Sequence, residues 1–209
     1  MNTLDYIVKK FNIDLNQKSP INIPEASREV MAETLAELNF NVGAEVGVWQ
    51  GEHAEILFKA NPKLLLYGID SWVPYKGNRD YHSYSYQPSY EQARKVLAPY
   101  SCTLIRSFSM DAVKDFEDKS LDFVYIDANH GFRYVVDDID SWLPKVKRGG
   151  IIYGHDFHRS VGRWNLQQVY YAVGSYAYAN RIKPWFSLGV DNANLDKGNG
   201  VKAWMWIRP

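Results

Sequence analysis

Apolar residues in the first forty positions recur at helical spacing in two stretches that prolines separate. Each stretch places four apolar residues on one face of a helix, namely Leu4, Ile7, Val8 and Phe11, and then Val30, Met31, Leu35 and Leu38. Between the stretches, Pro20 and Pro24 interrupt any regular element. The pattern predicts a helical lead-in over residues 1–41, followed by one compact domain over residues 42–209.

Beyond residue 41, short apolar runs alternate with helical stretches. Strands are predicted at residues 44–48, 65–69, 102–106, 122–126 and 150–154, and helices at 52–60, 89–98, 110–116, 133–143 and 162–179. Strands that alternate with helices are joined by crossovers, so the pattern predicts a doubly wound, parallel α/β sheet. Two more strand-like runs, 185–190 and 201–207, share a short polar connection, which requires an antiparallel pair.

One long irregular segment interrupts this rhythm at residues 72–89, where tyrosines are interspersed with Gly, Asn, Ser and Pro. A loop of this length inside a compact domain is usually functional or disordered. The tyrosines favour a function, and we expect the segment to be a lid over a binding site.

Composition and charge exclude several classes of function. The 24 basic and 24 acidic residues cancel, so no global field gathers nucleic acid or anionic lipid. The single cysteine, Cys102, cannot form an internal disulfide, the first residues lack the features of a signal peptide, and no apolar run is long enough for a membrane span. We expect a cytoplasmic protein with a small-molecule partner, whose aromatic-rich helix at 162–179 could contact a second subunit in a homo-oligomer.

Ligands of open parallel sheets bind outside the carboxyl ends of the strands, so the residues that follow each strand are the first candidates. Gly47 and Gly51 follow the first strand and allow close backbone approach, while Glu45 lies within it. Their spacing is not the G-x-G-x-x-G of dinucleotide-binding proteins, which counts against NAD. Asp70 ends the second strand, where a carboxylate can accept both hydroxyls of a ribose. Together these residues indicate an adenosine-type ligand; the alternatives are a turn residue for Asp70 and a buried structural acid for Glu45.

Four polar residues follow the fourth and fifth strands: Asp127, His130, His155 and Asp156. Because adjacent strand ends converge, we expect these side chains within a few ångströms of one another. Packing alone does not explain such a group. It suits either a divalent metal ion with carboxylate and imidazole ligands or a general base held by an acid, and the residues leave both open.

These blocks together resemble the class I S-adenosylmethionine-dependent methyltransferases. The segments Glu-Val-Gly-Val-x-x-Gly, Tyr-Ile-Asp-Ala-Asn-His and Gly-Gly-Ile-Ile-x-Gly-His-Asp occur in that family's order between about residues 42 and 156. The resemblance implies a Rossmann-like sheet of seven strands in the order 3-2-1-4-5-7-6, with strand seven antiparallel. It also implies S-adenosylmethionine as the cofactor.

The resemblance further implies which residues hold the cofactor: Glu45, Gly47 and Gly51 around the methionine part, Asp70 with Ser71 at the ribose, Ser109 and Met110 at the adenine, and Asp127. Phe108 stands where many relatives have an acid near the adenine amino group. Adenine is therefore expected to be held more by apolar contact than by a side-chain hydrogen bond.

The later blocks also resemble the metal site of catechol O-methyltransferase. Its three metal ligands correspond to Asp127, His155 and Asp156, and His155 replaces an acid, which favours a softer ion than Mg²⁺ or an empty site. His130 occupies the position of that enzyme's basic lysine, three residues beyond Asp127. We expect His130 to be the general base, with Asp127 and His155 as its catalytic partners; a histidine bonded to backbone at a helix start is the structural alternative.

The leading hypothesis is an S-adenosylmethionine-dependent methyltransferase that acts on a hydroxyl of a small molecule or sugar. One alternative is a nucleotide-binding protein of the same fold without transferase activity. Another is a metal-dependent glycosyltransferase, which the acidic run Asp137, Asp138 and Asp140 would suggest. That run lies on a helix whose apolar face is formed by Val135, Ile139 and Trp142, so we expect it to be solvated instead.

Overall fold

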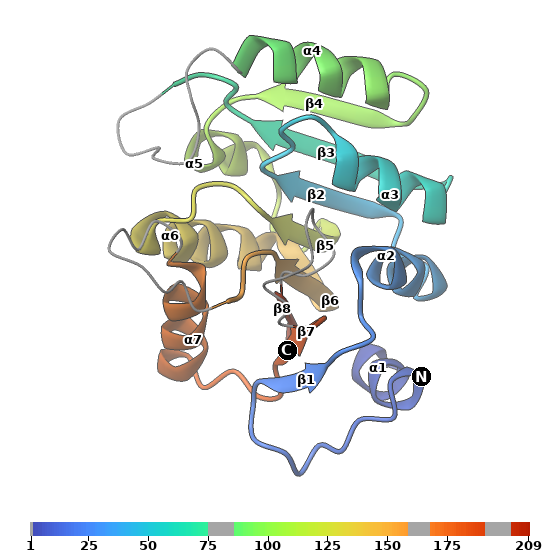
Figure 1. Ribbon diagram of the computed structural model, residues 1–209, viewed down its shortest axis with the longest axis vertical. Coiled ribbons are helices and arrows are strands. Elements are labelled where there is room, and N and C mark those ends of the chain that lie inside the picture. The colour runs from blue at the N-terminus through green and yellow to red at the C-terminus, as the bar shows by residue number, and fades with distance from the viewer. Residues whose placement is uncertain (1, 75–85, 159–167, 191–201) are drawn as a thin grey trace.

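A single eight-stranded sheet with helices on both faces forms the centre of the molecule (Figure 1). The structure is a computed structural model that describes residues 2–74, 86–158, 168–190 and 202–209. Its strands are β1 (Ile21–Ile23), β2 (Val42–Val46), β3 (Leu65–Asp70), β4 (Cys102–Arg106), β5 (Leu121–Ile126), β6 (Val146–Gly154), β7 (Phe186–Leu188) and β8 (Ala203–Ile207). Its helices are α1 (Thr3–Lys10), α2 (Arg28–Glu37), α3 (Glu52–Ala60), α4 (Tyr86–Leu97), α5 (Ser109–Ala112), α6 (Phe132–Trp142) and α7 (Val169–Ala179), with 3-10 turns η2 (Val113–Asp115) and η3 (Leu143–Lys145).

The strands lie in the order β1-β7-β8-β6-β5-β2-β3-β4. From β4 to β7 this is the predicted order, because the first strand of the prediction is β2. Strand β8 runs antiparallel to both of its neighbours, β6 and β7, and the other pairs are parallel. The doubly wound topology and the antiparallel pair at the end of the chain are therefore confirmed.

The sheet has eight strands rather than the predicted seven, because part of the lead-in joins it. Strand β1 pairs in parallel with β7, and Ile21 lies opposite Phe186. Ile21 and Ile23 are buried while Asn22 between them is exposed, which is the alternation of a strand with one covered face. Three residues between two prolines are too few for this period to be visible in the sequence. The two lead-in helices, α1 and α2, form as predicted.

Alternating side chains along the central strands divide the core into two layers. In β5, Phe123 and Tyr125 pack with α1, α2, α3 and α4, whereas Val124 and Ile126 pack with α5, α6 and α7 on the other face. Both faces of β5 are thus covered, which explains its apolar sequence from Phe123 to Ile126. None of the helices in the described part of the chain is both long and apolar enough to cross a membrane.

Three predicted segments fall partly or wholly outside the described residues. Helix α4 begins at Tyr86, so the last part of the predicted lid is helical, while residues 75–85 are outside the described ranges. The predicted helix at 162–179 is described from Val169 onward as α7. The connection between β7 and β8 falls on residues 191–201, which are likewise outside.

Candidate active site

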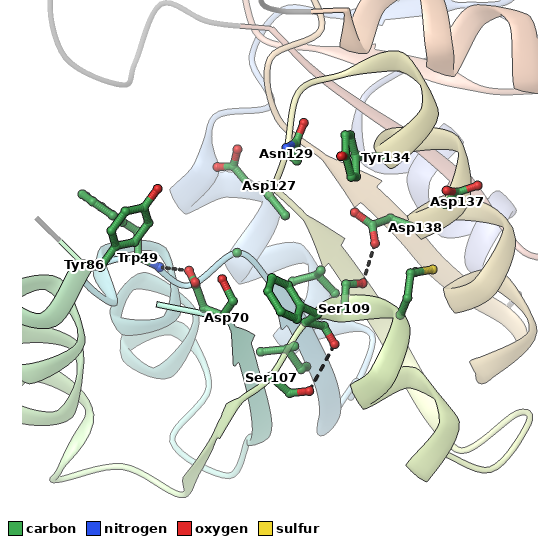
Figure 2. A pocket seen from close by; sticks show the side chains of 17 residues that line it. Trp49, Asp70, Tyr86, Ser107, Ser109, Asp127, Asn129, Tyr134, Asp137 and Asp138 are labelled. Atoms are coloured by element: carbon green, nitrogen blue, oxygen red, sulfur yellow. Dashed lines mark hydrogen bonds between the residues drawn. The ribbon is translucent and has the colours of Figure 1, made fainter. Parts of the chain in front are cut away.

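A cavity of about 270 Å³ lies at the carboxyl ends of β2, β3 and β5, where the strand order reverses (Figure 2). From β2 the chain crosses first toward β3 and β4 and later toward β5 and β6, which leaves this crevice between the two halves of the sheet. Its lining residues are Val46, Gly47, Trp49, Ile69, Asp70, Ser71, Tyr86, Ser107, Phe108, Ser109, Met110, Asp127, Ala128, Asn129, Tyr134, Asp137 and Asp138. Six of the predicted cofactor-binding residues are among them: Gly47, Asp70, Ser71, Ser109, Met110 and Asp127.

Gly47 brings the end of β2 against the end of β5. Its φ is +98°, and a Cβ at this position would lie 2.0 Å from the carbonyl oxygen of Asp127. Backbone bonds hold the end of β2 on both sides, because Gly47 N–H donates to the Ile69 carbonyl of β3 and Asp127 N–H donates to the Val46 carbonyl, each at 2.8 Å. Only glycine fits here, so backbone rather than a side chain borders the cavity at this position.

Asp70 is fixed by two backbone N–H groups at the edge of the cavity. One carboxylate oxygen accepts from Trp49 at 3.0 Å and the other from Trp72 at 2.9 Å, and both tryptophans have left-handed φ angles. The Trp72 indole also donates to the Trp49 carbonyl at 2.8 Å. Burial raises the pKa of Asp70, against the opposing effect of these backbone N–H groups. Asp70 thus closes a turn and also presents its carboxylate to the cavity.

Glu45 and Gly51 do not line this cavity. Glu45 is buried on the opposite face of β2, where its Oε1 lies 3.6 Å from His53 Nδ1, and burial raises its pKa. Gly51 has a φ of +88° at the start of α3, and a Cβ there would meet the Leu97 side chain at 3.2 Å. Gly51 therefore allows α3 to pack closely on α4.

Asp138 lines the cavity at the end away from Asp70, next to Ser109 (Figure 2). The Ser109 hydroxyl donates to Asp138, and the Trp142 indole donates to Ser109 Oγ at 2.9 Å. Burial raises the pKa of Asp138 to about 7. The expectation of a solvated acidic run is therefore wrong for Asp138.

The burial of Asp138 could have been predicted from the sequence. Asp138 lies three residues after Val135 and four before Trp142, which places it on the apolar face of α6. Its neighbours do reach the surface. Asp140 is exposed and accepts from the Tyr176 hydroxyl at 2.9 Å, and Asp137 lies 3.4 Å from Arg133 Nε with its side chain 44% exposed.

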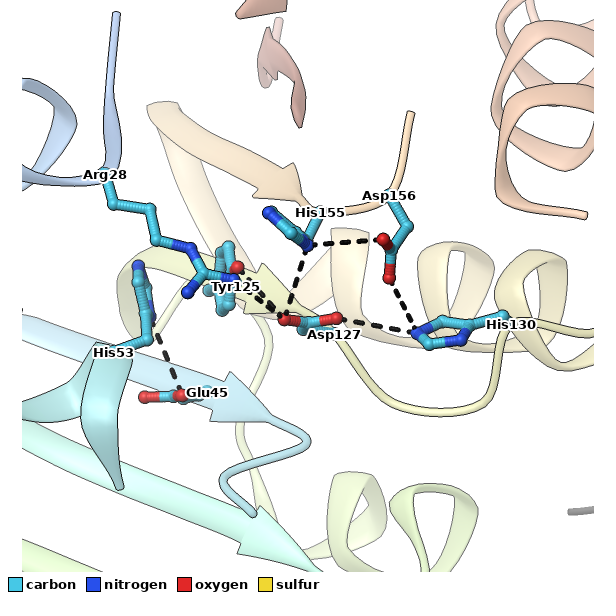
Figure 3. Close-up of polar contacts among 8 residues, drawn as sticks. All are labelled: Arg28, Glu45, His53, Tyr125, Asp127, His130, His155 and Asp156. Atoms are coloured by element: carbon cyan, nitrogen blue, oxygen red, sulfur yellow. Dashed lines mark hydrogen bonds and ion pairs between the residues drawn. The ribbon is translucent and has the colours of Figure 1, made fainter. Parts of the chain in front are cut away.

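The four polar residues after β5 and β6 do cluster, as expected (Figure 3). His130 Nε2 lies 2.9 Å from Asp156 Oδ2 and 3.6 Å from Asp127 Oδ1. His155 Nδ1 lies 3.4 Å from Asp156 Oδ1 and 3.9 Å from Asp127 Oδ2. One ligand atom from each of Asp127, His130 and Asp156 falls within 4.8 Å of the others, so these three have the spacing of a metal site. His155 borders that group, and His130 takes the place in it that the sequence assigned to His155.

The two histidines keep both carboxylates of this cluster ionised. Burial by itself raises the pKa of Asp127, but the contact with His130 and the charge of His155 outweigh it and lower that pKa. The same two histidines hold the pKa of Asp156 well below its usual range, again against burial. Asp156 also has a left-handed φ of 57°, so backbone strain accompanies its position in the cluster.

Arg28 reaches this cluster from the first turn of α2, which the sequence did not suggest. Its guanidinium Nη2 lies 3.7 Å from Asp127 Oδ2, and the Tyr125 hydroxyl donates to the same oxygen at 3.2 Å. Asp127 therefore belongs both to the cavity wall and to the polar cluster. No local pattern marks Arg28, because its partner lies in a distant part of the chain and meets it only through the packing of α2 on the sheet.

Comparison with known proteins identifies the family to which the chain belongs. Residues 44–157, more than half of the chain, match the family described as "Methyltransferase domain", and the chain belongs to that family. It is also 32% identical over 53 residues to the uncharacterized protein y4gI of Sinorhizobium fredii. That match covers 25% of this chain and only 6% of the relative's length.

Solved structures share the whole fold. An O-methyltransferase from Bacillus cereus, determined in complex with SAH, aligns with a TM-score of 0.61 at 13% identity over 99% of this chain and 90% of its own. The O-methyltransferase TomG from Streptomyces achromogenes, involved in tomaymycin synthesis and determined with SAM, gives 0.60 at 14% identity over 99% and 89%. The chain is a class I S-adenosylmethionine-dependent methyltransferase domain.

Proposed function

We propose that this protein transfers a methyl group from S-adenosylmethionine to a hydroxyl oxygen of a small-molecule acceptor. The observation that carries the proposal is the position of Asp127, which lines the cavity at the switch point and also belongs to the cluster of His130, His155 and Asp156. A cofactor in the cavity would therefore lie next to groups that can handle a proton. We also expect the protein to work in the cytoplasm, since a single cysteine cannot form an internal disulfide.

The lining of the cavity supports binding of the cofactor along its length. The volume of about 270 Å³ is close to the lower end of small-molecule sites, about 300–1,000 Å³. We propose that the Asp70 carboxylate, next to Ser71, accepts the ribose hydroxyls and that the bare backbone at Gly47 faces the methionine part. Bound there, S-adenosylmethionine supplies a methyl group activated by its sulfonium.

The adenine end of the cavity combines apolar walls with one acid. Ile69, Phe108 and Met110 provide flat or flexible apolar contact. Phe108 stands where many relatives have an acid, and we propose that Asp138, from α6, supplies a carboxyl group for the adenine amino group instead. The Ser109 hydroxyl, which donates to Asp138, fixes that carboxyl group in the cavity wall.

The chain's own contribution to the chemistry is to orient the acceptor and to remove its proton. Holding two reactants in line supplies a large part of the rate in such transfers. We propose that His130 accepts the hydroxyl proton, with Asp156 at 2.9 Å holding the imidazole and stabilising its charged form. His130 does not line the cofactor cavity, so the acceptor would approach from the side of the cluster.

A metal ion is the second chemistry that this cluster fits. Asp127, His130 and Asp156 would hold it, and a mixed imidazole and carboxylate set suits ions such as Zn²⁺ or Fe²⁺ better than Mg²⁺. Such an ion would lower the pKa of the acceptor hydroxyl. Arg28, 3.7 Å from Asp127, opposes a second cation beside that carboxylate, which favours the base.

The proposed function is tested by incubating the protein with S-adenosylmethionine and a panel of small hydroxyl compounds, and by measuring SAH (S-adenosylhomocysteine) by mass spectrometry. We expect SAH that depends on an acceptor, and each methylated product should gain 14 mass units on oxygen. Product formation that continues equally with Asp70→Asn would contradict the assignment of the cavity. The absence of any product, together with tight SAH binding, would indicate a binding protein instead.

A further inference from the structure

A second, smaller cavity lies beside the cluster, and it shares no lining residue with the cofactor cavity. Its volume is about 40 Å³, and its lining residues are Ala26, Ser27, Arg28, Met31, His53, Tyr125, Tyr153, His155, Leu188, Gly189 and Ala203. Three of these residues, Arg28, Tyr125 and His155, also approach Asp127 Oδ2, as Figure 3 shows. Asp127 therefore separates the two cavities.

Several polar atoms around this small cavity are buried without a hydrogen-bond partner among the described residues. They are Arg28 Nε, the Tyr153 hydroxyl, His53 Nε2 and His155 Nε2, whereas His53 Nδ1 faces Glu45 Oε1 at 3.6 Å. The residues His53, Tyr153 and His155 are 6%, 2% and 8% exposed. Buried polar groups in native proteins are nearly always paired, and so many unpaired atoms around one cavity indicate that it binds a polar occupant.

The chemistry of these atoms selects an occupant rich in hydrogen-bond acceptors. The Nε–H of Arg28 can only donate, and the Tyr153 hydroxyl can also donate. A ring nitrogen donates only when it carries the proton, and in both histidines it is Nδ1 that faces a carboxylate. The acid nearest to Arg28 is Asp127, at 3.7 Å, which is longer than a hydrogen bond, and Asp127 already accepts from Tyr125. Glu45, the acid nearest to His53, does not line the cavity, and burial raises its pKa toward the neutral form. Within the described residues, the guanidinium therefore has an ion pair with Asp127 but no acid within hydrogen-bond distance.

The size of the cavity limits the occupant further. A water molecule needs about 10–15 Å³ of such space, so 40 Å³ accommodates two or three waters or one small planar group. An aromatic ring or a phosphorylated sugar does not fit. A carboxylate does, and its flat pair of oxygens matches the planar guanidinium.

On the basis of the proposed function, we propose that this cavity binds a carboxylate group of the methyl acceptor, so that the acceptor is a hydroxy acid. Arg28 connects the polar cluster with the small cavity, because its Nη2 faces Asp127 and its Nε is the unpaired donor at the small cavity. A carboxylate bound there would direct the rest of the acceptor toward Asp127 and His130. The hydroxyl would then reach the cofactor cavity from the side of the cluster.

The direct test follows the Nε–H signal of Arg28 by ¹H–¹⁵N NMR while sodium acetate is added at constant ionic strength. The signal is assigned by its loss in Arg28→Gln, and Arg133→Gln, whose side chain is 88% exposed on α6, is the matched control. We expect acetate, but not its neutral isostere acetamide, to shift the Arg28 signal saturably in the wild type and in Arg133→Gln. An unchanged signal, or an equal shift with acetamide, overturns the proposal and leaves water as the occupant.

A second variant keeps the test valid if Arg28→Gln folds poorly. Tyr153→Phe removes only the unpaired hydroxyl, and we expect it to weaken acetate binding about 2- to 10-fold. Unchanged acetate affinity in Tyr153→Phe would contradict the assigned site.

Binding of SAH to the wild type, measured by calorimetry, separates the two proposals. If SAH binds and acetate does not, only the carboxylate site is wrong; if SAH does not bind, the proposed function itself is wrong.

Discussion

Asp156 lies 2.9 Å from Nε2 of His130, closer to that nitrogen than Asp127, which lies at 3.6 Å. The sequence predicted that Asp127 or His155 would orient His130, yet the closest partner comes from the end of β6. The low pKa of Asp156, caused by the two neighbouring histidines, keeps its carboxylate charged over the whole physiological range. Asp156 is thus suited to stabilise a positively charged His130.

Replacing His130 with alanine is expected to lower kcat about 10²- to 10⁴-fold, because a positioned general base typically contributes that much. The affinity for SAH should not change, since His130 does not line the cofactor cavity. Steady-state kinetics and calorimetry on the same preparation measure both quantities. If a chelator abolishes activity in the wild type and an added divalent ion restores it, a metal ion held by Asp127, His130 and Asp156 performs the step and the base is wrongly assigned.

Replacing Gly47 with alanine is expected to destabilise the protein. Its positive φ alone costs a non-glycine residue about 1–3 kcal/mol, and the added Cβ would lie 2.0 Å from the Asp127 carbonyl oxygen. Gly174→Ala is the matched control, because its Cβ meets nothing within 4 Å in helix α7, and it should stabilise by about 0.5–1 kcal/mol. Urea denaturation measures both. Equal stability of the two variants would contradict the close approach of Gly47 to the Asp127 carbonyl at the ends of β2 and β5.

Asp138 is expected to make stability depend on pH. Burial raises its pKa from 3.8 to about 7, so between these values the folded protein binds more protons at this site than the unfolded chain. The free energy of unfolding should therefore fall as pH rises from about 4 to 7, by at most a few kcal/mol at about 1.4 kcal/mol per unit of pKa.

Asp138→Asn removes that contribution. Relative to the wild type, the variant should gain stability as pH rises through this window, and the difference should be constant above pH 7. Urea denaturation between pH 4.5 and 8 measures the difference. A difference that does not vary with pH would show that Asp138 is ionised at ordinary pH and that its burial is less complete than the structure indicates.

The topology was predictable because apolar runs such as those of β5 and β6 alternate with helices whose apolar residues recur at clear helical spacing. Strand β1 was not, since three residues contain too little of a pattern. At the site, Asp70 and Asp127 were predictable from their places at strand ends. Arg28 was missed because only tertiary packing brings it to Asp127. Asp138 was misjudged for a different reason: neighbouring acids masked its place on the apolar face of α6.

Replacing Asp70 with asparagine is expected to weaken SAH binding at least tenfold. Hydrogen bonds to a charged group contribute about 1.5–3 kcal/mol, and tenfold in affinity corresponds to about 1.4 kcal/mol. Asparagine keeps one acceptor oxygen and therefore one of the two bonds from the N–H groups of Trp49 and Trp72, which protects the turn better than alanine would. Asp118→Asn, on the surface beside Lys145, is the matched control and should bind SAH normally. Equal affinities of the two variants would remove Asp70 from the cofactor site.

Calorimetric titration of the wild-type protein with SAH, NAD and a uridine diphosphate sugar tests the identity of the cavity at the switch point most directly. Binding of SAH at one site per chain, with no heat from NAD or the sugar nucleotide, is the result that this cavity predicts. Binding of the sugar nucleotide without SAH would contradict it and favour a glycosyltransferase.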